Sequence, residues 1–330
     1  MKLNIIGDPD NIETNEVDQN AMGGTELMKY ALAKKLDPAL LDKFQIIPSR
    51  VRKLEKGKIP ILWLHDLPGD PESKHLADGG WEKFEQIVCV SHWQRQQYQN
   101  YYGIPASKMT VLQNAIEPIP EVEKPNHKNC VNIVYHTTPH RGLELLIPVM
   151  DWIEEHLKHV EWHLDVYSSF KIYGWGERDA PYNPLFDRIE ASDGMTNQGF
   201  VPNEEVHKAL QKAHIFCLPS IWSETSCIAL IEAMSAGCIC VHSSLAALPE
   251  TACNWSLMYD YTEDKDEHAT RCAFLLADAI QLVGDPSMKD RMDMQKAYTD
   301  GFYNWEVRAK QWESFLQKIL RGKGIKLDVK

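Results

Sequence analysis

The sequence has no long hydrophobic run and no excess of positive charge. None of its stretches approaches the ~18 apolar residues that span a bilayer. The opening residues, MKLNIIGD, lack the long apolar region of a signal peptide, so we expect a cytoplasmic protein without a transmembrane helix. Lys and Arg number 35 against 47 Asp and Glu, a net charge of −12. Because affinity for a polyanion comes largely from phosphate neutralisation, no nucleic-acid partner is expected.

The eight cysteines include no C-x-x-C pair, and most of them lie in apolar strand or helix contexts. This placement predicts reduced, buried thiols rather than a metal site or a disulfide framework. Internal repeats and low-complexity tracts are also missing.

What the chain does have is an alternation of apolar strands and helical patterns, typical of doubly wound α/β sheets. Its length exceeds the comfortable size of a single core, so two domains are expected. Residues 117–129, EPIPEVEKPNHKN, contain three prolines and no apolar periodicity, which predicts an interdomain linker. We therefore assign residues 1–120 and 121–303 to two Rossmann-like domains, and residues 304–330 to a last helix and tail.

The strands are predicted from short apolar runs. In chain order they are Leu3–Ile6, Ile46–Ile47, Ile61–Leu64, Ile87–Val90, Thr110–Leu112, Val131–Tyr135, Trp162–Tyr167, Ile215–Leu218 and Cys238–His242.

The most informative segment is 214–238, HIFCLPSIWSETSCIALIEAMSAGC. An apolar strand leads through a polar turn into a helix that is apolar on nearly every side, and therefore buried. Glu232 lies inside this helix and needs a partner, because a buried carboxylate is costly unless it is paired. Thr225 and Ser226 can cap the helix, and its free backbone N–H groups favour an anion. Glu224 stands just before them.

This segment resembles the signature of retaining glycosyltransferases of family 4, which belong to the group 1 glycosyl transferases and have the GT-B fold. A "PS" strand end is followed by Glu224, seven residues and Glu232. The resemblance implies that Glu224 contacts the donor sugar and Glu232 the ribose hydroxyls of a nucleotide-sugar. Backbone amides of three successive residues would hold the diphosphate: Thr225, Ser226 and Cys227. The alternative is a helix N-cap with an internal salt bridge.

The resemblance also implies a fold of two Rossmann-like domains facing a central cleft. The short N-terminal domain would bind the acceptor, the C-terminal domain the nucleotide-sugar, and the last helix would cross back to the N-terminal domain. That helix carries an apolar stripe that includes Trp305, Trp312 and Leu316. The basic tail after it is either a solvated end or a weak contact with an anionic membrane surface.

Two N-terminal features match the family pattern. The sequence GGTE looks like a glycine-rich ligand loop, in which Gly23 and Gly24 allow close backbone approach; an ordinary turn is the alternative. His65 ends an apolar strand, and ligands of open α/β sheets bind outside the carboxyl ends of strands. The resemblance implies that His65 contacts the donor sugar or its surroundings, whereas pairing with Asp66 is the alternative.

In YHTTPHRGLELL, Arg141 precedes Gly142 and a new helix. The resemblance implies that Arg141 binds the donor diphosphate, where a fixed guanidinium stabilises the charge of the leaving group. The family's earlier "GR" arginine is replaced by His136, Thr137 and Thr138. A single arginine, helped by the hydroxyl of Thr138, would then do the work of two cations, which puts efficient turnover in question.

The sequence QGFVPNEEV resembles the loop that frames the nucleobase in this family. Its backbone at Phe200 and Val201 would contact the base, with Gly199 allowing the approach. A strand-to-helix turn capped by Asn203 is the alternative, and both interpretations can hold together.

The reaction implied is transfer of a sugar from a UDP- or GDP-sugar to an acceptor hydroxyl, with retention at the anomeric carbon. His65, Arg141 and Glu224 are the candidate catalytic residues. No metal or other cofactor is expected, although Asp8 and Asp10 form one metal-like motif. The alternatives are a non-catalytic nucleotide-sugar-binding protein, a GT-B-fold epimerase and a DNA-modifying glycosyltransferase. The acceptor, whether glycan, lipid or small molecule, is not readable from the sequence.

Overall fold

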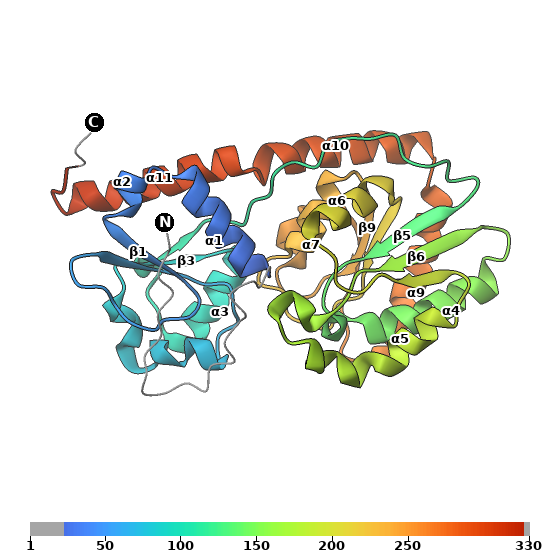
Figure 1. The fold of residues 1–330 in the computed structure, drawn as a ribbon, viewed down its shortest axis with the longest axis horizontal. Coiled ribbons are helices and arrows are strands. Elements are labelled where there is room, and N and C mark those ends of the chain that lie inside the picture. Colours follow the sequence, from blue (N-terminus) through green and yellow to red (C-terminus); the bar gives the residue numbers. More distant parts are fainter. Residues whose placement is uncertain (1–22, 327–330) are drawn as a thin grey trace. The chain divides into compact units, whose positions relative to one another are not determined.

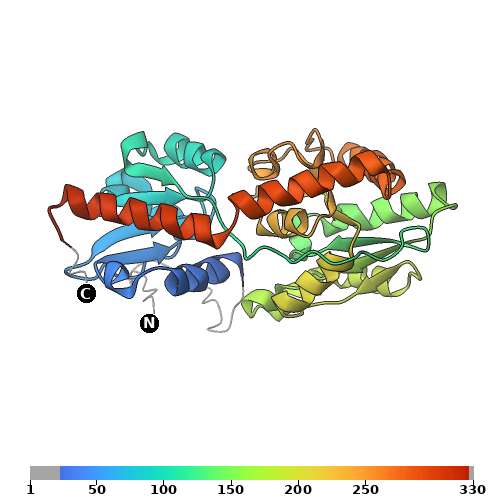
Figure 2. The ribbon, with the colours of Figure 1, turned by 90° about the horizontal axis from the view of Figure 1, so that it is seen from above.

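The computed structural model describes residues 23–326. These residues divide into two compact units, shown as ribbons in Figures 1 and 2: unit 1 comprises residues 23–115 and 303–326, and unit 2 comprises residues 116–302. The predicted first strand, Leu3–Ile6, and the motif of Asp8 and Asp10 lie outside the described residues.

Unit 1 contains a parallel sheet with the strand order β1-β2-β3-β4. Its strands are β1 (Phe44–Pro48), β2 (Ile59–Trp63), β3 (Gln86–Cys89) and β4 (Met109–Val111). Its helices are α1 (Gly24–Lys35), α2 (Pro38–Leu41), α3 (His92–Tyr102) and α11 (Trp305–Gly322), with the 3-10 segments η1 (Pro71–Lys83) and η2 (Ala106–Lys108). Helix α11 belongs to this unit although it ends the chain, and its buried Trp312 packs edge-on against Trp63 of β2.

Unit 2 contains a six-stranded parallel sheet with the order β10-β9-β8-β5-β6-β7. Its strands are β5 (Val131–Tyr135), β6 (Trp162–Val166), β7 (Met195–Asn197), β8 (Ile215–Leu218), β9 (Ile239–Ser243) and β10 (Leu257–Tyr259). Counted from the first strand of the unit, this is the order 3-2-1-4-5-6 of a Rossmann fold. The order reverses between β5 and β8, where chain connections leave toward opposite sides of the sheet.

Helices cover both faces of this sheet (Figure 1). The helices are α4 (Leu143–His156), α5 (Asn183–Glu190), α6 (Asn203–Lys212), α7 (Ile228–Ser235), α8 (Leu248–Ala252), α9 (Lys265–Leu282) and α10 (Pro286–Phe302), with the 3-10 segments η3 (Pro139–Arg141), η4 (Phe170–Tyr173) and η5 (Gly176–Tyr182). Helices α4 and α9 pack together on one face, while α6 and α10 contact α7 on the other.

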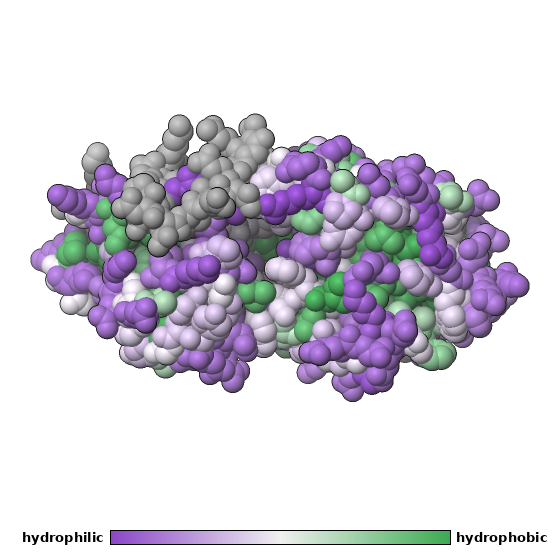
Figure 3. Space-filling model, turned by 90° about the horizontal axis from the view of Figure 1, so that it is seen from below, coloured by the Kyte–Doolittle hydropathy of each residue, from purple (hydrophilic) through white to green (hydrophobic). Residues whose placement is uncertain are grey.

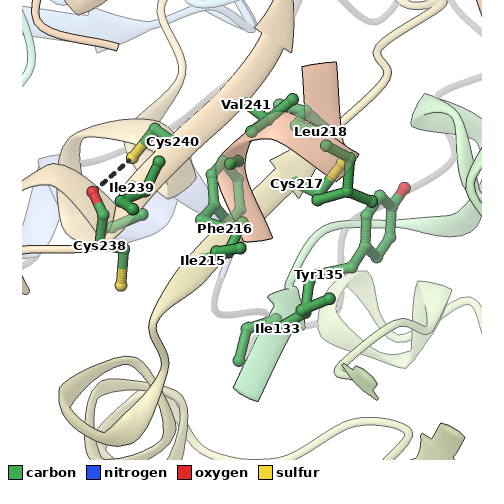
Figure 4. Packing of buried hydrophobic residues seen from close by; sticks show 14 of the residues in the cluster. Ile133, Tyr135, Ile215, Phe216, Cys217, Leu218, Cys238, Ile239, Cys240 and Val241 are labelled. Atoms are coloured by element: carbon green, nitrogen blue, oxygen red, sulfur yellow. Dashed lines mark hydrogen bonds between the residues drawn. The ribbon is translucent and has the colours of Figure 1, made fainter. Parts of the chain in front are cut away.

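The core of unit 2 is built on its central strands (Figure 4). All four residues of β8 are fully buried, as expected for a strand covered on both faces. All eight cysteines lie within the described residues and none is in a disulfide; six of them are buried, in agreement with the predicted free thiols. This core fixes the strand ends from which the site residues project.

The proline-containing segment 117–129, predicted as an interdomain linker, belongs to unit 2 and is held on its surface. The ammonium group of Lys124 donates to the carbonyls of Leu210 and Ala213 at the end of α6, and to that of Ala236 at the end of α7. A lysine at two helix C-termini satisfies carbonyls that have no partner within either helix. The segment therefore ties the ends of α6 and α7 together.

The strand predictions within the described residues are confirmed to within two residues at each end. Two strands were missed, β7 and β10, each of three residues at an edge of the unit 2 sheet. Such short strands carry too few alternating residues to be seen as a pattern.

Hydrophilic residues cover most of the coloured surface in Figure 3, with smaller hydrophobic areas among them. In the part of the chain that the structure describes, every helix is too short or too polar to cross a membrane.

Candidate functional site

The candidate site of unit 2 lies where the strand order of its sheet reverses. The segment after β5 runs from His136 to Arg141, and the segment after β8 runs from Pro219 to Cys227. Ligands of open α/β sheets bind outside the carboxyl ends of strands at this switch point. The fold thus brings two predicted site segments together although more than 70 residues lie between them.

A glycine lets these two segments approach each other. Gly142 has a φ of +130°, and a Cβ atom there would lie 2.1 Å from the carbonyl oxygen of Pro219. Any other residue would push the segments apart, since that distance is far below van der Waals contact. The backbone N–H of Ile221 also donates to the carbonyl of Arg141, at 3.3 Å. Close packing at Gly142 therefore sets the position of Arg141.

Arg141 and Glu224 form an ion pair in this space. Nη1 of Arg141 lies 2.5 and 2.6 Å from the two carboxylate oxygens of Glu224, and Nε donates to Oγ1 of Thr138 at 3.1 Å. Glu224 is only 4% exposed. Burial by itself would lower the pKa of Arg141, but the Glu224 carboxylate outweighs it and the pKa is raised. The guanidinium stays charged and, in the ligand-free protein, its charge is neutralised by Glu224.

Glu232 has a different set of partners. Its Oε1 accepts hydrogen bonds from Nδ2 of Asn203 at 3.1 Å and from Nε2 of His207 at 2.9 Å. Nδ1 of His136 lies 3.9 Å from Oε2. The predicted need for a partner is thus met inside the protein, from the helix that packs beside α7 and from the end of β5.

The pKa values in this cluster follow from burial and from these contacts. Burial raises the pKa of Glu232, but the hydrogen bond from His207, the nearby His136 and the Asn203 amide outweigh it, so the pKa is lowered. The pKa of His207 is depressed by burial and raised more strongly by Glu232, with a net increase. Burial lowers the pKa of His136 to about 4. At neutral pH Glu232 is therefore ionised and His136 is neutral.

The loop before α7 differs from the prediction at its cap. Cys227, not Thr225 or Ser226, is the N-cap residue, and no side-chain hydrogen bond caps the helix. The capping prediction is wrong because Glu224 is held in its ion pair and its carbonyl accepts a bond from Ala247, so the helix begins only at Ile228. Its first backbone N–H groups have no side-chain cap, which suits an anionic ligand.

The loop after β7 places Phe200 and Val201 at the same carboxyl edge of the sheet. Phe200 is 44% exposed, whereas Val201 packs against the core of unit 2. Gly199 has a φ of +61°, in the left-handed region that glycine favours. Asn203, the alternative cap residue, is not the cap of α6; Pro202 takes that position and the Asn203 amide points to Glu232.

An aromatic group borders the ion pair. The ring of His140 stacks on Phe170 with centroids 5.2 Å apart and meets Trp222 edge-on at 4.9 Å. Trp222 is 39% exposed. His140 directly precedes Arg141, and Trp222 stands two residues before Glu224, so this surface adjoins the charged pair.

The remaining candidates, Gly23, Gly24 and His65, belong to unit 1. Gly23 is the N-cap of α1, which begins at Gly24. His65 follows β2; its backbone N–H donates to Ser49 and its ring lies 4.7 Å from that of Trp63. Burial lowers the pKa of His65 to about 3, so this imidazole is neutral at physiological pH.

Sequence reasoning did not identify Asn203, His207 and His136 as partners of Glu232. The spacing of Asn203 and His207, four residues apart on a helix, places both on one face and could have suggested a shared partner. Nothing in the sequence shows that this partner is Glu232, because α6 and α7 are separated by β8.

A family model described as "Glycosyl transferases group 1" matches residues 116–297 of this chain. One curated relative belongs to the phosphatidylinositol N-acetylglucosaminyltransferase of Arabidopsis thaliana, of which it is one subunit, and it is 22% identical over 241 residues. That alignment includes 72% of this chain and 50% of the relative, so the chain spans about half the length of that protein.

Solved structures show the same fold. A glycosyltransferase from Rickettsia africae matches with a TM-score of 0.66 at 13% identity, covering 94% of this chain and 84% of that one. Anabaena HepE in complex with UDP-glucose matches with a TM-score of 0.61 at 12% identity, covering 87% and 82%. At these identities the likeness establishes the fold alone, and the predicted GT-B fold with two Rossmann-like domains is confirmed.

Proposed function

The chain belongs to the family of group 1 glycosyl transferases, and from this premise we propose that it transfers a sugar from a nucleotide-sugar to an acceptor hydroxyl with retention of configuration. Unit 2 would bind the donor and unit 1 the acceptor. The observation that carries the proposal is the ion pair of Arg141 and Glu224 at the switch point of the Rossmann sheet.

Arg141 would exchange its carboxylate partner for the donor diphosphate. The guanidinium is charged and 22% of its side chain is exposed, so a phosphate can reach it. Arginine binds phosphate through several parallel N–H groups. The first amides of α7, at Thr225, Ser226 and Cys227, would share the anion. When the bond to the sugar breaks, this cation would stabilise the charge on the departing diphosphate.

Release from Arg141 would leave Glu224 beside the donor sugar. A carboxylate there can accept hydrogen bonds from sugar hydroxyls and orient the ring for transfer. Retention through a front-face route, in which the leaving phosphate takes the acceptor proton, requires no covalent enzyme nucleophile. On this proposal the reaction needs no metal, and Thr138 keeps the guanidinium directed at the phosphate.

Glu232 would accept hydrogen bonds from the ribose hydroxyls, while the backbone at Phe200 and Val201 would contact the base. The exposed ring of Phe200 and the left-handed turn at Gly199 leave this backbone open to a ligand. We propose UDP- or GDP-sugars as donors; HepE, a relative in fold, was crystallised with UDP-glucose. The acceptor class and the cytoplasmic location stay predictions.

One observation favours a second candidate, a nucleotide-sugar-binding protein without transferase activity. The family's second cation is replaced by neutral groups, because His136 has a pKa near 4 and Thr138 is a hydroxyl. Such a site would bind the nucleotide but stabilise the leaving group less well.

The experiment begins with thermal-shift screening of UDP- and GDP-sugars, followed by acceptor-dependent release of nucleoside diphosphate from each sugar that stabilises the protein. Stabilisation with acceptor-dependent release supports the transferase. Stabilisation without release from any acceptor class favours the binding protein, and conversion of the donor without an acceptor would indicate an epimerase. Release should persist in EDTA; loss that magnesium or manganese restores would overturn metal independence.

A further inference from the structure

The two polar residues on the first turns of α6 make an unusual contact with the helix next to them. Asn203 and His207 both direct a nitrogen atom at Oε1 of Glu232, at 3.1 and 2.9 Å. The two nitrogens are themselves 3.0 Å apart. An ionised carboxylate only accepts hydrogen bonds, so Nε2 of His207 must carry its proton, and both nitrogens donate to the same oxygen.

The second oxygen of Glu232 is treated differently. Within residues 23–326 Oε2 accepts no hydrogen bond, and His136 lies 3.9 Å from it, beyond hydrogen-bond distance. The carboxylate plane is therefore set through Oε1, while Oε2 keeps its lone pairs for another donor. This division is what a carboxylate needs if it is to accept from a ligand hydroxyl without turning away.

The helix that provides these donors is itself held in place. Lys124 binds carbonyls at the C-terminal end of α6 and the carbonyl of Ala236 at the C-terminal end of α7. Asn203 and His207 join the same two helices near the N-terminal end of α6. Two separate attachments fix the orientation of one helix against the other, and with it the position of Glu232.

We propose that Asn203 and His207 are positioning residues for the recognition of ribose: they hold Oε1 of Glu232 so that Oε2 accepts a hydrogen bond from a ribose hydroxyl. This inference rests on the proposed function. It adds that discrimination between a ribonucleotide and its deoxy analogue depends on α6, which makes no contact with the sugar. A rigid acceptor rejects the analogue because its lone pair is left unsatisfied, whereas a loose acceptor turns to another donor or to water.

The test compares nucleotide affinities by calorimetry. UDP and GDP are measured with the wild-type protein, and the tighter binder is then compared with its 2′-deoxy and 3′-deoxy forms. We expect the wild type to prefer the ribonucleotide over one deoxy form by on the order of tenfold. In Asn203→Ala, His207→Ala and the double variant this preference should fall to about twofold or less, while the deoxy form binds about as well as before.

Two further variants sharpen the result. His207→Gln keeps an N–H donor at similar reach and should retain most of the preference. His156→Ala, at an exposed histidine of α4, is the matched control and should change nothing. Thermal melting of each variant shows whether it is folded.

The outcomes separate the inference from the function on which it rests. If the variants weaken ribonucleotide and deoxy form by the same factor, or leave the preference intact, Asn203 and His207 only support the fold and the inference is wrong. A wild type that binds a nucleotide without preferring the ribo form overturns the inference and leaves the proposed function standing. A wild type that binds neither UDP nor GDP overturns both.

Discussion

Glu224 and Glu232 are two carboxylates in one short stretch of chain, and both are almost completely buried, at 4% and 5% exposure. Glu224 meets a permanent cation through both oxygens, whereas Glu232 meets one amide and one imidazole through a single oxygen. The difference lies in what a ligand can replace. A charged phosphate can compete for Arg141, but it has no reason to displace the donors of Glu232.

Burial affects the two sites in opposite ways. An ion pair at low exposure compensates both charges, so removing one partner leaves an isolated buried charge. A carboxylate held by neutral or titratable donors depends on the hydrogen bonds themselves. The first arrangement suits a group that must change partners during a reaction, and the second suits a group that must stay still. The four predictions below test this contrast.

The largest effect is expected for Arg141→Ala. Loss of the guanidinium leaves the buried Glu224 carboxylate unpaired and should reduce the free energy of unfolding by about 3 kcal/mol. Binding of nucleoside diphosphate should weaken by ~1.5–3 kcal/mol in whatever fraction remains folded. Chemical denaturation and calorimetry measure the two quantities.

Arg188→Ala is the control, because its ion pair with Asp151 is half-exposed and should contribute within about 0.5 kcal/mol. The double variant Arg141→Ala/Glu224→Gln should regain much of the lost stability, since no buried charge remains. Unchanged diphosphate affinity in folded Arg141→Ala would remove Arg141 from the site.

Glu224→Gln should separate turnover from binding. Turnover should fall by about a hundredfold, the scale for loss of one positioned charged group in an active site. Affinity for free nucleoside diphosphate should be kept or should increase, because Arg141 no longer has to leave a carboxylate. Weaker diphosphate binding in this variant would contradict the exchange of partners. Steady-state kinetics and calorimetry on the same preparation provide both measurements.

Glu232→Gln should weaken free nucleoside diphosphate and intact donor by a similar factor, about tenfold, because both carry the ribose. Its effect on stability should be small, since an amide oxygen can still accept from Asn203 and His207. Normal diphosphate binding in this variant would mean that Glu232 serves only the internal cluster. Calorimetry with both ligands decides between the two.

The smallest effect concerns pH. Because the pKa of His207 is raised above its ordinary 6.5 by Glu232, the folded protein binds this proton more tightly than the unfolded chain does. The stabilisation is complete below 6.5 and is lost as pH rises through the folded value.

From about pH 6 to about pH 8 the wild type should therefore lose more stability than His207→Gln, by less than about 1 kcal/mol. Melting temperatures of both proteins across this range test the prediction, with His156→Ala as control. Parallel curves for wild type and His207→Gln would show that the pair contributes no charge-dependent stability.

Much of unit 2 was predictable because its central strands are continuous apolar runs. Val131–Tyr135 and Ile215–Leu218 were predicted with the bounds that the structure shows. The edge strand β7 was missed because three residues give no periodic signal. The segment 117–129 was recognised by its prolines, but its attachment to α6 and α7 through Lys124 depends on carbonyl groups that no composition reveals.

The candidate site divides in the same way. The residues Arg141, Glu224 and Glu232 were identified from local patterns, and their roles toward a donor stay predictions. The contact of Arg141 with Glu224 was not predicted, since each had been assigned to a different part of the ligand. The capping of α7 was predicted wrongly, because the ion pair determines where that helix begins.

By itself, the sequence determined which segments are strands and helices, and which polar residues stand at their ends. Those properties depend on hydrophobic periodicity, glycine and proline, which act within a few residues of one another. Only the tertiary structure decided that β5 and β8 are neighbours, that Arg141 pairs with Glu224 and that α6 holds Glu232. Such pairings depend on the order of strands in the sheet and on distances of a few ångströms, because the energy of a buried charge is decided by the groups that touch it.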